Sequence, residues 1–388
     1  MNIGIESISF FTSRYVLDLR TMAKARGVDA EKYVNGIGQE KMSVPPPGED
    51  VITLAANAGH QALESIDTDS IEMVMFATES ATDQSKAGGI YVHNLLKLKP
   101  HCRVFELKQA CYSGTAGLLL ARDMIHQYPD RKVLILMSDI ARYGLNSAGE
   151  ITQGAGAIAM VISSQPKIMT IEPESGYYTE DVMDFWRPNY RDEALVDGKY
   201  SVRVYLKALT ESWNLYHQRT HIGFEQFSRF CYHLPFSRMA EKAHKHLAKI
   251  NHIDLSEHEL ATHINDGLVY NRNIGNIYTG SLYLSLISML ENNPQDMSNH
   301  KVSLFSYGSG CVGELFAGQV LPGYRNHLSS DLHQSLLESR KELTYPEYTD
   351  FYNFAYVQDG TTQSMPTFDT GCYRLSQIKN HKRIYETL

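Results

Sequence analysis

The stretch Lys108-Gln-Ala-Cys-Tyr-Ser-Gly-Thr-Ala-Gly-Leu-Leu-Leu120 decides the fold class, because it joins an apolar run to a helical pattern. Before it, Arg103-Val-Phe-Glu-Leu107 has the composition of a short buried strand, and after it apolar residues recur at helical spacing. Cys111 therefore lies where a strand passes into the first turn of a helix. The free N–H groups and positive end of a helix favour a thiolate, so this position predicts a nucleophilic cysteine. The alternative is an inert cysteine in a core helix, since free cysteine is among the most buried residue types.

Length and composition limit the class of protein. The chain has 388 residues, enough for two domains or one large duplicated domain, and its shares of hydrophobic (43%) and charged (21%) residues are typical of globular proteins. A net charge of −8 without any run of Lys or Arg argues against nucleic-acid binding. The start, Met1-Asn-Ile-Gly-Ile-Glu6, lacks a secretion pattern, and no apolar run approaches the roughly 18 residues of a membrane span.

The cysteines indicate the compartment. They number five, without CxxC pairs, at positions 102, 111, 231, 311 and 372. Such an odd set favours free thiols in a reducing environment over a disulfide framework. We therefore expect a cytoplasmic protein with no membrane partner.

Apolar runs of strand length alternate with helical patterns along the chain, which predicts a layered α/β architecture. The predicted strands cover residues 3–10, 71–77, 103–107, 132–137, 157–162, 230–235 and 302–307. The predicted helices cover residues 17–33, 49–66, 81–98, 202–218 and 236–250, and another helix opens at 275–284. Residues 171–199 are acidic, aromatic and irregular, which predicts a connecting segment or lid. The tail beyond Tyr345 has no readable role.

Two segments repeat one pattern. Cys111-Tyr-Ser-Gly-Thr-Ala-Gly-Leu-Leu-Leu120 and Asn276-Ile-Tyr-Thr-Gly-Ser-Leu-Tyr-Leu-Ser285 each place a polar residue before a small-residue turn and an apolar helix. Each is followed by a strand and a glycine-rich loop. The repeat predicts two related halves, residues 1–168 and 169–388, whose matching helices meet near one site.

Four polar residues lie at the ends of predicted elements: Glu79, Cys111, His233 and Asn276. Carbon–carbon bond formation on a thioester requires a thiol nucleophile and a carboxylate base. It also requires groups such as an imidazole and an amide that stabilise an oxyanion. Each residue also has a structural interpretation. Glu79 and Asn276 can cap helices, and His233 can be a satisfied core histidine. Their joint placement in one α/β pattern favours catalysis.

Two further patterns argue against a cofactor or a metal. Gly308-Ser-Gly-Cys-Val-Gly313 matches GxGxxG, but a strand-like segment follows it where a dinucleotide site needs a helix. His244 and His246 lie two apart on a predicted helix and face different ways, so we expect no metal site. On the same helix, Arg238 and Lys242 share a face that is either solvated or binds ligand phosphates.

Eight motifs in the same order resemble the 3-hydroxy-3-methylglutaryl-CoA synthase family, particularly its bacterial form, from the first strand to about Tyr324. The motifs are Val74-Met-Phe-Ala-Thr-Glu-Ser80, Glu106-Leu-Lys-Gln-Ala-Cys-Tyr112, Asp139-Ile-Ala-Arg-Tyr-Gly144, Thr152-Gln-Gly-Ala-Gly-Ala157, Asp184-Phe-Trp-Arg-Pro188, His233-Leu-Pro-Phe236, Gly275-Asn-Ile-Tyr-Thr-Gly-Ser281 and Phe305-Ser-Tyr-Gly-Ser-Gly310. The resemblance implies a thiolase-like fold of two duplicated α/β halves in α-β-α-β-α layers. It also implies a homodimer with no metal or redox cofactor.

The resemblance implies roles for individual residues. Cys111 matches the nucleophile that takes the acetyl group, and Glu79 the acid and base of the condensation. His233 and Asn276 match residues that hold and polarise the acetoacetyl thioester. Further substrate-binding positions are Tyr143, Asp139, Asp184, Phe185, Thr152 and Ser309, with Arg238 and Lys242 at the CoA phosphates. Arg238 stands where the family more usually has lysine, which keeps the charge but changes the geometry of phosphate binding.

These observations predict an acyltransferase that condenses acetyl-CoA with acetoacetyl-CoA and water. The products are 3-hydroxy-3-methylglutaryl-CoA and CoA, formed through acetyl-Cys111 in the mevalonate route to isoprenoids. A second hypothesis is the polyketide β-branching relative, which acts on a ketone bound to a carrier protein. A third is a non-catalytic dimeric scaffold with a thiolase fold.

Overall fold

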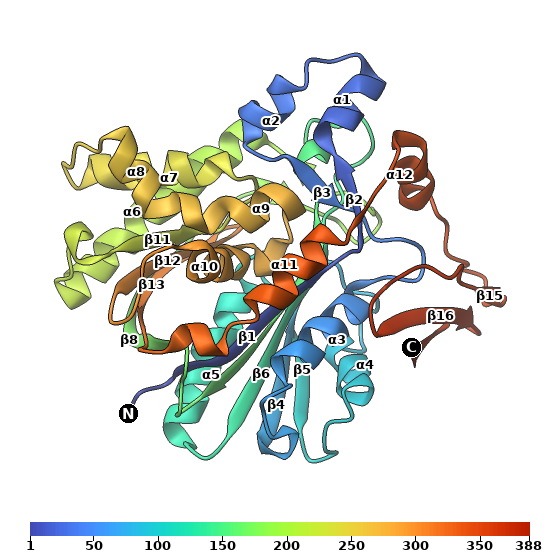
Figure 1. Cartoon of the computed structure of the whole chain (residues 1–388), viewed down its shortest axis with the longest axis horizontal. Helices are drawn as coiled ribbons and strands as arrows, with labels where there is room; N and C mark the ends of the chain where they lie inside the picture. Colours follow the sequence, from blue (N-terminus) through green and yellow to red (C-terminus); the bar gives the residue numbers. More distant parts are fainter.

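A nine-stranded sheet forms the centre of the computed structural model, which describes residues 1–388 (Figure 1). Its N-terminal strands are β1 (Gly4–Thr12), β4 (Ile71–Ala77), β5 (Arg103–Leu107), β6 (Lys132–Ile140) and β7 (Ala155–Ser163). Its C-terminal strands are β8 (Met169–Thr179), β11 (Arg229–Tyr232), β12 (Lys301–Gly308) and β13 (Val312–Val320). The strand order is β11-β12-β13-β8-β1-β7-β6-β4-β5.

The strand order contains the same arrangement twice. The run β4-β6-β7-β1 corresponds to the run β11-β12-β13-β8, and each has one parallel pair followed by two antiparallel pairs. Only β5 lacks a counterpart. The two runs join where β1 and β8 pair at Gly4 with Thr170 and at Ile5 with Met169. The predicted duplication of an α/β half is therefore confirmed.

Helices α3 (Val51–Ala62) and α5 (Ser113–Gln127) cover opposite faces of the N-terminal strands. Successive side chains on β6 point to opposite faces, as strand geometry requires. Leu136 lies against Gly59 of α3, whereas Ile135 lies against Gly117 of α5. Apart from the edge strand β5, the N-terminal strands are therefore largely buried on both faces, which explains their continuous apolar runs.

Helices α6 (Gly198–Thr220) and α10 (Ser281–Asn292) cover opposite faces of the C-terminal strands. On β12, Phe305 belongs to the core cluster that contains α6, whereas its neighbour Leu304 belongs to the cluster that contains α10. Thr115 of α5 shares a 2.8 Å hydrogen bond with Tyr283 of α10, so these two helices form one middle layer. The α-β-α-β-α arrangement is confirmed.

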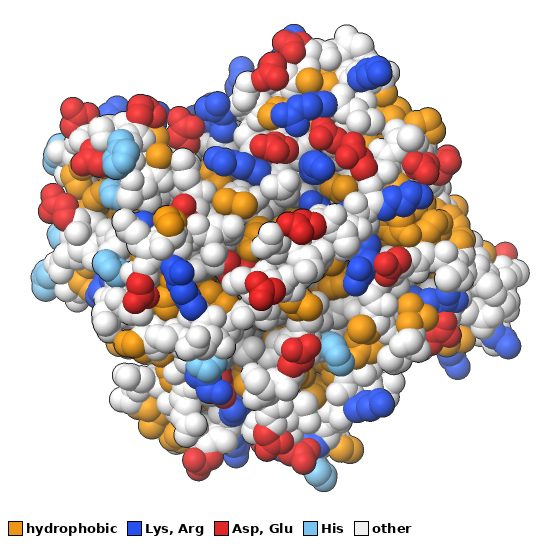
Figure 2. Space-filling model, in the orientation of Figure 1, with side chains coloured by type: hydrophobic (Ala, Val, Ile, Leu, Met, Phe, Trp, Pro, Cys, Tyr) orange, Lys and Arg blue, Asp and Glu red, His pale blue; other side chains and the backbone are white.

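Smaller elements surround the layers. The other helices are α1 (Leu19–Arg26), α2 (Glu31–Ile37), α4 (Gly88–Leu95), α7 (Arg238–Ile250), α8 (Glu257–Ile264), α9 (Val269–Ile274), α11 (Ser330–Glu338) and α12 (Tyr345–Tyr352). The other strands are β2 (Tyr15–Asp18), β3 (Lys41–Ser43), β9 (Phe185–Trp186), β10 (Leu195–Val196), β14 (Lys341–Glu342), β15 (Gln363–Ser364), β16 (Tyr373–Lys379) and β17 (Lys382–Thr387). None of the helices is long and apolar enough to cross a membrane. Acidic and basic side chains intermingle over the face in Figure 2.

The prediction of a lid over residues 171–199 was wrong for its first third. Residues up to Thr179 belong to β8, which pairs with β13 in the central sheet. Their acidic side chains hid the strand, although Glu172 is mostly buried and is paired with Lys301 at 2.5 Å and with the hydroxyl of Tyr216 at 3.2 Å. The tail, which had no readable role, forms helices and strands that pack on the N-terminal half.

Two predicted helices were too long. Residues 81–87 form turns before α4, since the side chain of Asp83 accepts hydrogen bonds from the backbone N–H groups of Ser85 and Lys86. Such local bonds compete with helix formation. The predicted helix 17–33 instead contains the end of β2, the whole of α1 and the start of α2. Gly27, in the left-handed conformation, ends α1.

Candidate active site

Glu79 and Cys111 meet at the carboxyl ends of neighbouring strands. Glu79 follows β4 by two residues, and Cys111 lies between β5 and α5. The thiol of Cys111 donates a hydrogen bond to Oε1 of Glu79 at 2.7 Å. The sequence predicts that these side chains share a site, and the structure brings them into direct contact.

The turn that carries Cys111 is tightly constrained. Ala110 has a left-handed backbone (φ 44°), which is strained for a residue with a side chain. The hydroxyl of Ser113 accepts a hydrogen bond from Gln109 N at 2.6 Å and donates one to Ala110 O at 2.8 Å. Gly308 closes over this turn, since a Cβ at that position would lie 2.6 Å from Gln109 O. The position of the thiol therefore depends on both halves of the chain.

The expected thiolate at Cys111 is not supported by its surroundings. Burial and the adjacent Glu79 carboxylate raise the pKa of the Cys111 thiol well above its usual value. Cys111 precedes Tyr112, the N-terminal cap of α5, and its sulfur faces the carboxylate. A helix end contributes only about 0.3–1 kcal/mol, which does not offset a negative charge in direct contact. Cys111 is therefore a neutral thiol with a base beside it.

Asp139, at the end of β6, organises the loop of Glu79. Its side chain is fully buried. One carboxylate oxygen accepts hydrogen bonds from Thr78 Oγ1, Glu79 N and Ser80 Oγ, at 2.7 to 3.0 Å. The other accepts from Thr279 N and Oγ1 at 3.1 and 2.6 Å. Burial and, second, the charge of Asp139 raise the pKa of Glu79, so its carboxylate is a stronger base than an exposed one.

Aromatic rings enclose the thiol. Cys111 packs with Ala141 and Tyr278, and the rings of Tyr143 and Phe185 lie against this group. The ring centroids of Tyr143, Phe185 and Tyr278 are 5.8 to 6.1 Å apart, with their planes steeply inclined. The hydroxyl of Tyr278 is buried without a hydrogen-bond partner. Tyr278 was not among the site residues predicted from the sequence, although its place two residues after Asn276 was a usable signal.

Asn276 joins the C-terminal half to the loop that follows β6. Its backbone N–H donates to Thr152 O at 3.1 Å, and its amide nitrogen donates to Tyr143 Oη at 3.4 Å. Its amide oxygen accepts hydrogen bonds from Tyr278 N and Ser281 Oγ at 2.9 and 2.8 Å, so its orientation is fixed. The structure therefore brings Asn276 together with Tyr143. Thr152 contributes its backbone, while its hydroxyl donates to Gly149 O.

His233 follows β11 directly and is almost fully buried. Its backbone N–H donates to Phe305 O at 2.8 Å, and its carbonyl accepts from Tyr205 Oη at 2.9 Å. Its ring makes no hydrogen bond within the chain. Burial lowers the pKa of His233 to about 3, so the imidazole is neutral, with one N–H to donate.

Asp184 supports the loop that contains Ser309. It is fully buried, and its carboxylate accepts hydrogen bonds from Tyr307 Oη at 2.7 Å, Gly310 N at 2.9 Å and Ser201 Oγ at 3.0 Å. Ser309 O in turn accepts from Gln109 Nε2 at 3.2 Å, beside the cysteine turn. Asp184 thus holds the loop of Ser309 and Gly310, which belongs to the C-terminal half, and Ser309 joins that loop to the turn that carries Cys111.

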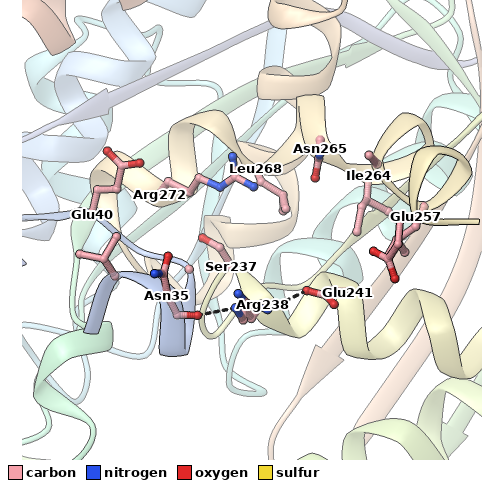
Figure 3. Close-up of a pocket in the computed structure, with 14 residues that line it drawn as sticks. Asn35, Glu40, Ser237, Arg238, Glu241, Glu257, Ile264, Asn265, Leu268 and Arg272 are labelled. Carbon is pink, nitrogen blue, oxygen red and sulfur yellow. Dashed lines mark hydrogen bonds and ion pairs between the residues drawn. The ribbon is translucent and has the colours of Figure 1, made fainter. Parts of the chain in front are cut away.

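Arg238 and Lys242 lie on the first two turns of α7. A pocket of about 390 Å³ lies between α2, α7, α8 and α9. Figure 3 shows Arg238 on its wall. Its lining includes two arginines, Arg238 and Arg272, and three glutamates, Glu40, Glu241 and Glu257. The Arg238 guanidinium donates to Asn35 O and to Glu241 at 2.5 and 3.2 Å. Lys242 is exposed outside this lining, with its ammonium 5.2 Å from the ring of Phe236.

No group of three or more His, Cys, Asp or Glu side chains is arranged to hold a metal ion. His244, which the sequence analysis weighed as a ligand, shares hydrogen bonds of 2.9 Å with Tyr232 and His263. These neighbours make it a structural histidine.

The duplicated five-layer fold and the cysteine held before a middle-layer helix define a thiolase-like enzyme. Comparisons with known proteins narrow this class. Residues 1–167 match the model of the hydroxymethylglutaryl-coenzyme A synthase N terminal, and residues 170–259 and 245–387 match that of its C terminal. The chain belongs to the hydroxymethylglutaryl-CoA synthase family.

Individual relatives cover nearly the whole chain. It is 42% identical over 386 residues to the hydroxymethylglutaryl-CoA synthase of Enterococcus faecalis, with 99% of this chain and 100% of that protein covered. It is 33% identical to the polyketide biosynthesis 3-hydroxy-3-methylglutaryl-ACP synthase of Bacillus subtilis, with 90% of this chain and 87% of that protein covered. A crystal structure of an HMG-CoA synthase complexed with CoA superimposes with a TM-score of 0.95, at 40% identity and full coverage of both chains.

Proposed function

We propose that this enzyme condenses acetyl-CoA with acetoacetyl-CoA and water to give 3-hydroxy-3-methylglutaryl-CoA and CoA. The observation that carries the proposal is the 2.7 Å contact between the Cys111 thiol and the Glu79 carboxylate inside the aromatic enclosure. A thiol that can carry an acetyl group lies beside a base that can remove a proton from that group.

In the first step Cys111 takes the acetyl group. Its sulfur attacks the thioester carbonyl of acetyl-CoA, the bond to the CoA sulfur breaks, and CoA leaves as a thiol. The proton lost by Cys111 ends on the departing sulfur, with Glu79 as the nearest group that can pass it on. One thioester replaces another, so this step needs no energy input.

In the second step Glu79 removes a proton from the methyl group of acetyl-Cys111. The resulting carbon nucleophile attacks the ketone carbon of acetoacetyl-CoA, and the ketone oxygen becomes an alkoxide that Glu79 protonates. The neutral imidazole of His233 and the fixed amide of Asn276 are the donors assigned to that oxygen. Water then cleaves the bond to Cys111 and releases the product.

The basic residues of α7 bind the phosphates of the CoA moieties. Arg238 and Lys242 lie one helical turn apart on α7 and provide two positive charges, of which Arg238 lies on the wall of the pocket in Figure 3. Because the pocket lining also holds three glutamates, we assign the phosphates to its rim, at the exposed ends of these two side chains. The reaction as written needs no metal and no redox cofactor.

Intact-mass measurement after incubation with acetyl-CoA tests the proposal. An acetyl group on Cys111 that disappears when acetoacetyl-CoA is added, with formation of 3-hydroxy-3-methylglutaryl-CoA, supports it. A chain that never gains mass supports the scaffold hypothesis instead.

A carrier-protein substrate is the second candidate, because the polyketide relative from Bacillus subtilis is 33% identical over most of the chain. The two functions share the chemistry and differ in the group that bears the ketone. Rates measured with acetoacetyl-CoA and with an acetoacetyl carrier protein separate them. A strong preference for the carrier would contradict the proposed substrate.

We further propose a cytoplasmic homodimer that feeds isoprenoid synthesis through mevalonate. Strand β5 ends the sheet with an unpaired edge, and its apolar Val104, Phe105 and Leu107 are only partly buried. Such an edge is a template for a second chain. Light scattering in solution tests the dimer, and a monomeric mass would contradict it.

A further inference from the structure

The loop that carries Tyr143 into the active site is attached to α12, a helix of the C-terminal tail. The residues on either side of Tyr143 both contact Tyr352, the last residue of α12. Arg142 Nη2 donates to Tyr352 O at 2.6 Å, and Gly144 N donates to the Tyr352 hydroxyl at 3.0 Å. The Arg142 guanidinium also lies 4.1 Å from the Tyr352 ring. Tyr352 therefore holds the loop on both sides of Tyr143, because its carbonyl and ring contact the Arg142 side chain and its hydroxyl binds the Gly144 backbone.

A second connection runs through Gln153. The backbone N–H of Tyr143 donates to the Gln153 amide oxygen at 2.8 Å, and the Gln153 amide nitrogen donates to the Tyr348 hydroxyl at 3.3 Å. That hydroxyl donates to the carboxylate of Glu150 at 2.7 Å. Gln153, Tyr348 and Glu150 are all buried, so these bonds are shielded from water.

The helix α12 is itself firmly placed. Thr344 and Glu347 cap its start with reciprocal hydrogen bonds. Phe351 packs edge-on against Tyr15 of β2 and Phe368, at centroid distances of 5.5 and 4.9 Å. The helix is thus attached to the outer N-terminal elements and can serve as a support for the loop.

We propose that Tyr352 is a positioning residue for the reaction, acting through Tyr143. It sets the loop so that the Tyr143 hydroxyl reaches Asn276 and the Tyr143 ring packs against Phe185 and Tyr278 beside Cys111. This inference rests on the proposed function, since it assigns Tyr352 to the site of that reaction. It also gives the tail a role, because a chain that ends before α12 lacks this support.

The test substitutes Tyr352→Phe, which removes one hydroxyl and keeps the ring over Arg142. We expect kcat for the condensation to fall about tenfold, the factor that corresponds to one lost hydrogen bond of about 1.4 kcal/mol. Tyr352→Phe should have little further effect in a Tyr143→Phe background, because it acts through the same residue. If the losses in kcat of the two single variants multiply in the double variant, the proposal is overturned. An unchanged kcat in the Tyr352→Phe single variant also overturns it.

Tyr15→Phe is the matched control. Tyr15 packs against the same helix and its hydroxyl accepts a hydrogen bond from Asp369 N at 3.2 Å, but it makes no hydrogen bond to residues 141–154. The Tyr15→Phe substitution should leave kcat unchanged. A tenfold loss in this variant as well would mean that removing any tyrosine hydroxyl near α12 lowers activity, and would overturn a specific role for Tyr352.

Hydrogen–deuterium exchange separates this inference from the proposed function. Tyr352→Phe should speed exchange in peptides that cover residues 141–147 and leave α5 and α10 unchanged, whether or not the wild-type chain condenses these substrates. Unchanged exchange in those peptides overturns the inference. A wild-type chain that takes no acetyl group overturns the proposed function alone.

Discussion

The carboxylate of Asp139 accepts hydrogen bonds from Thr279, 140 residues further along the chain, through both the hydroxyl at 2.6 Å and the backbone N–H at 3.1 Å. The same carboxylate accepts a hydrogen bond from the backbone N–H of Glu79. One buried side chain thus connects the base of the N-terminal half with the turn that follows Asn276 in the C-terminal half. Catalysis therefore requires both halves of the chain to be assembled around this carboxylate.

Cys111→Ser should abolish formation of the acetyl-enzyme, because an alcohol is a much weaker nucleophile than a thiol next to a carboxylate base. Intact-mass measurement after incubation with acetyl-CoA checks this. Cys372→Ser, at an exposed cysteine remote from the site, is the control and should acetylate normally. Full acetylation of Cys111→Ser would disprove the assignment of the nucleophile.

Glu79→Gln should still form the acetyl-enzyme but should lose condensation by about 10²- to 10⁴-fold, the usual contribution of a general base. Thiol exchange can pass its proton to the departing CoA sulfur, whereas removal of a methyl proton requires a base. Acetyl-enzyme is measured by mass and product by chromatography. Equal loss of both steps would contradict the separate role of Glu79 in carbon–carbon bond formation.

The rate of condensation should rise with pH through the raised pKa of Glu79, since only its ionised form is a base. Asp139→Asn removes a neighbouring negative charge and should therefore move this rise to lower pH. Profiles of kcat/KM against pH measure both effects. A profile of Asp139→Asn that moves to higher pH would contradict the electrostatic argument, and circular dichroism checks that the variant is folded.

His233→Ala should raise the KM for acetoacetyl-CoA at least tenfold and leave acetylation of Cys111 nearly unchanged, because His233 is assigned to the second substrate. Steady-state kinetics with acetoacetyl-CoA varied, together with the acetylation assay, measure the two effects. Since the ring of His233 is buried, thermal unfolding of the variant is the necessary control. A larger defect in acetylation than in condensation would be inconsistent with this role.

Glu49 should make the stability of the fold depend on pH. It is buried, both carboxyl oxygens lack hydrogen-bond partners, and burial raises its pKa from 4.5 to about 8. The folded state then holds a proton that the unfolded state releases, so the free energy of unfolding should fall as pH rises from about 4.5 to 8.

Glu49→Gln should remove this part of the pH dependence and stabilise the protein by about 1–3 kcal/mol at pH 8, because no charge is then buried. Urea unfolding at a series of pH values between 5 and 9 measures the effect. A curve that keeps the wild-type slope would mean that Glu49 is not the group responsible.

The sequence located the reactive pair because strand ends can be read from apolar runs. Glu79 and Cys111 each follow such a run, and parallel strands deliver their carboxyl ends to one edge of a sheet. The same reading failed for residues 171–179, where the acidic side chains of Glu172 and Glu174 hid the strand β8. It also misjudged the ionisation of Cys111, since the helix start was visible in the sequence and the orientation of the neighbouring carboxylate was not.

The sequence by itself determined most of the core strands and helices, the family that the motifs resemble and the residue types that could carry the chemistry, because these depend on local periodicity and composition. Only the tertiary structure decided that the thiol is neutral beside Glu79, that Tyr278 belongs to the enclosure and that α12 supports the loop of Tyr143. Those features depend on distances between residues far apart along the chain. Such distances are fixed by how the layers pack, and no short stretch of sequence encodes them.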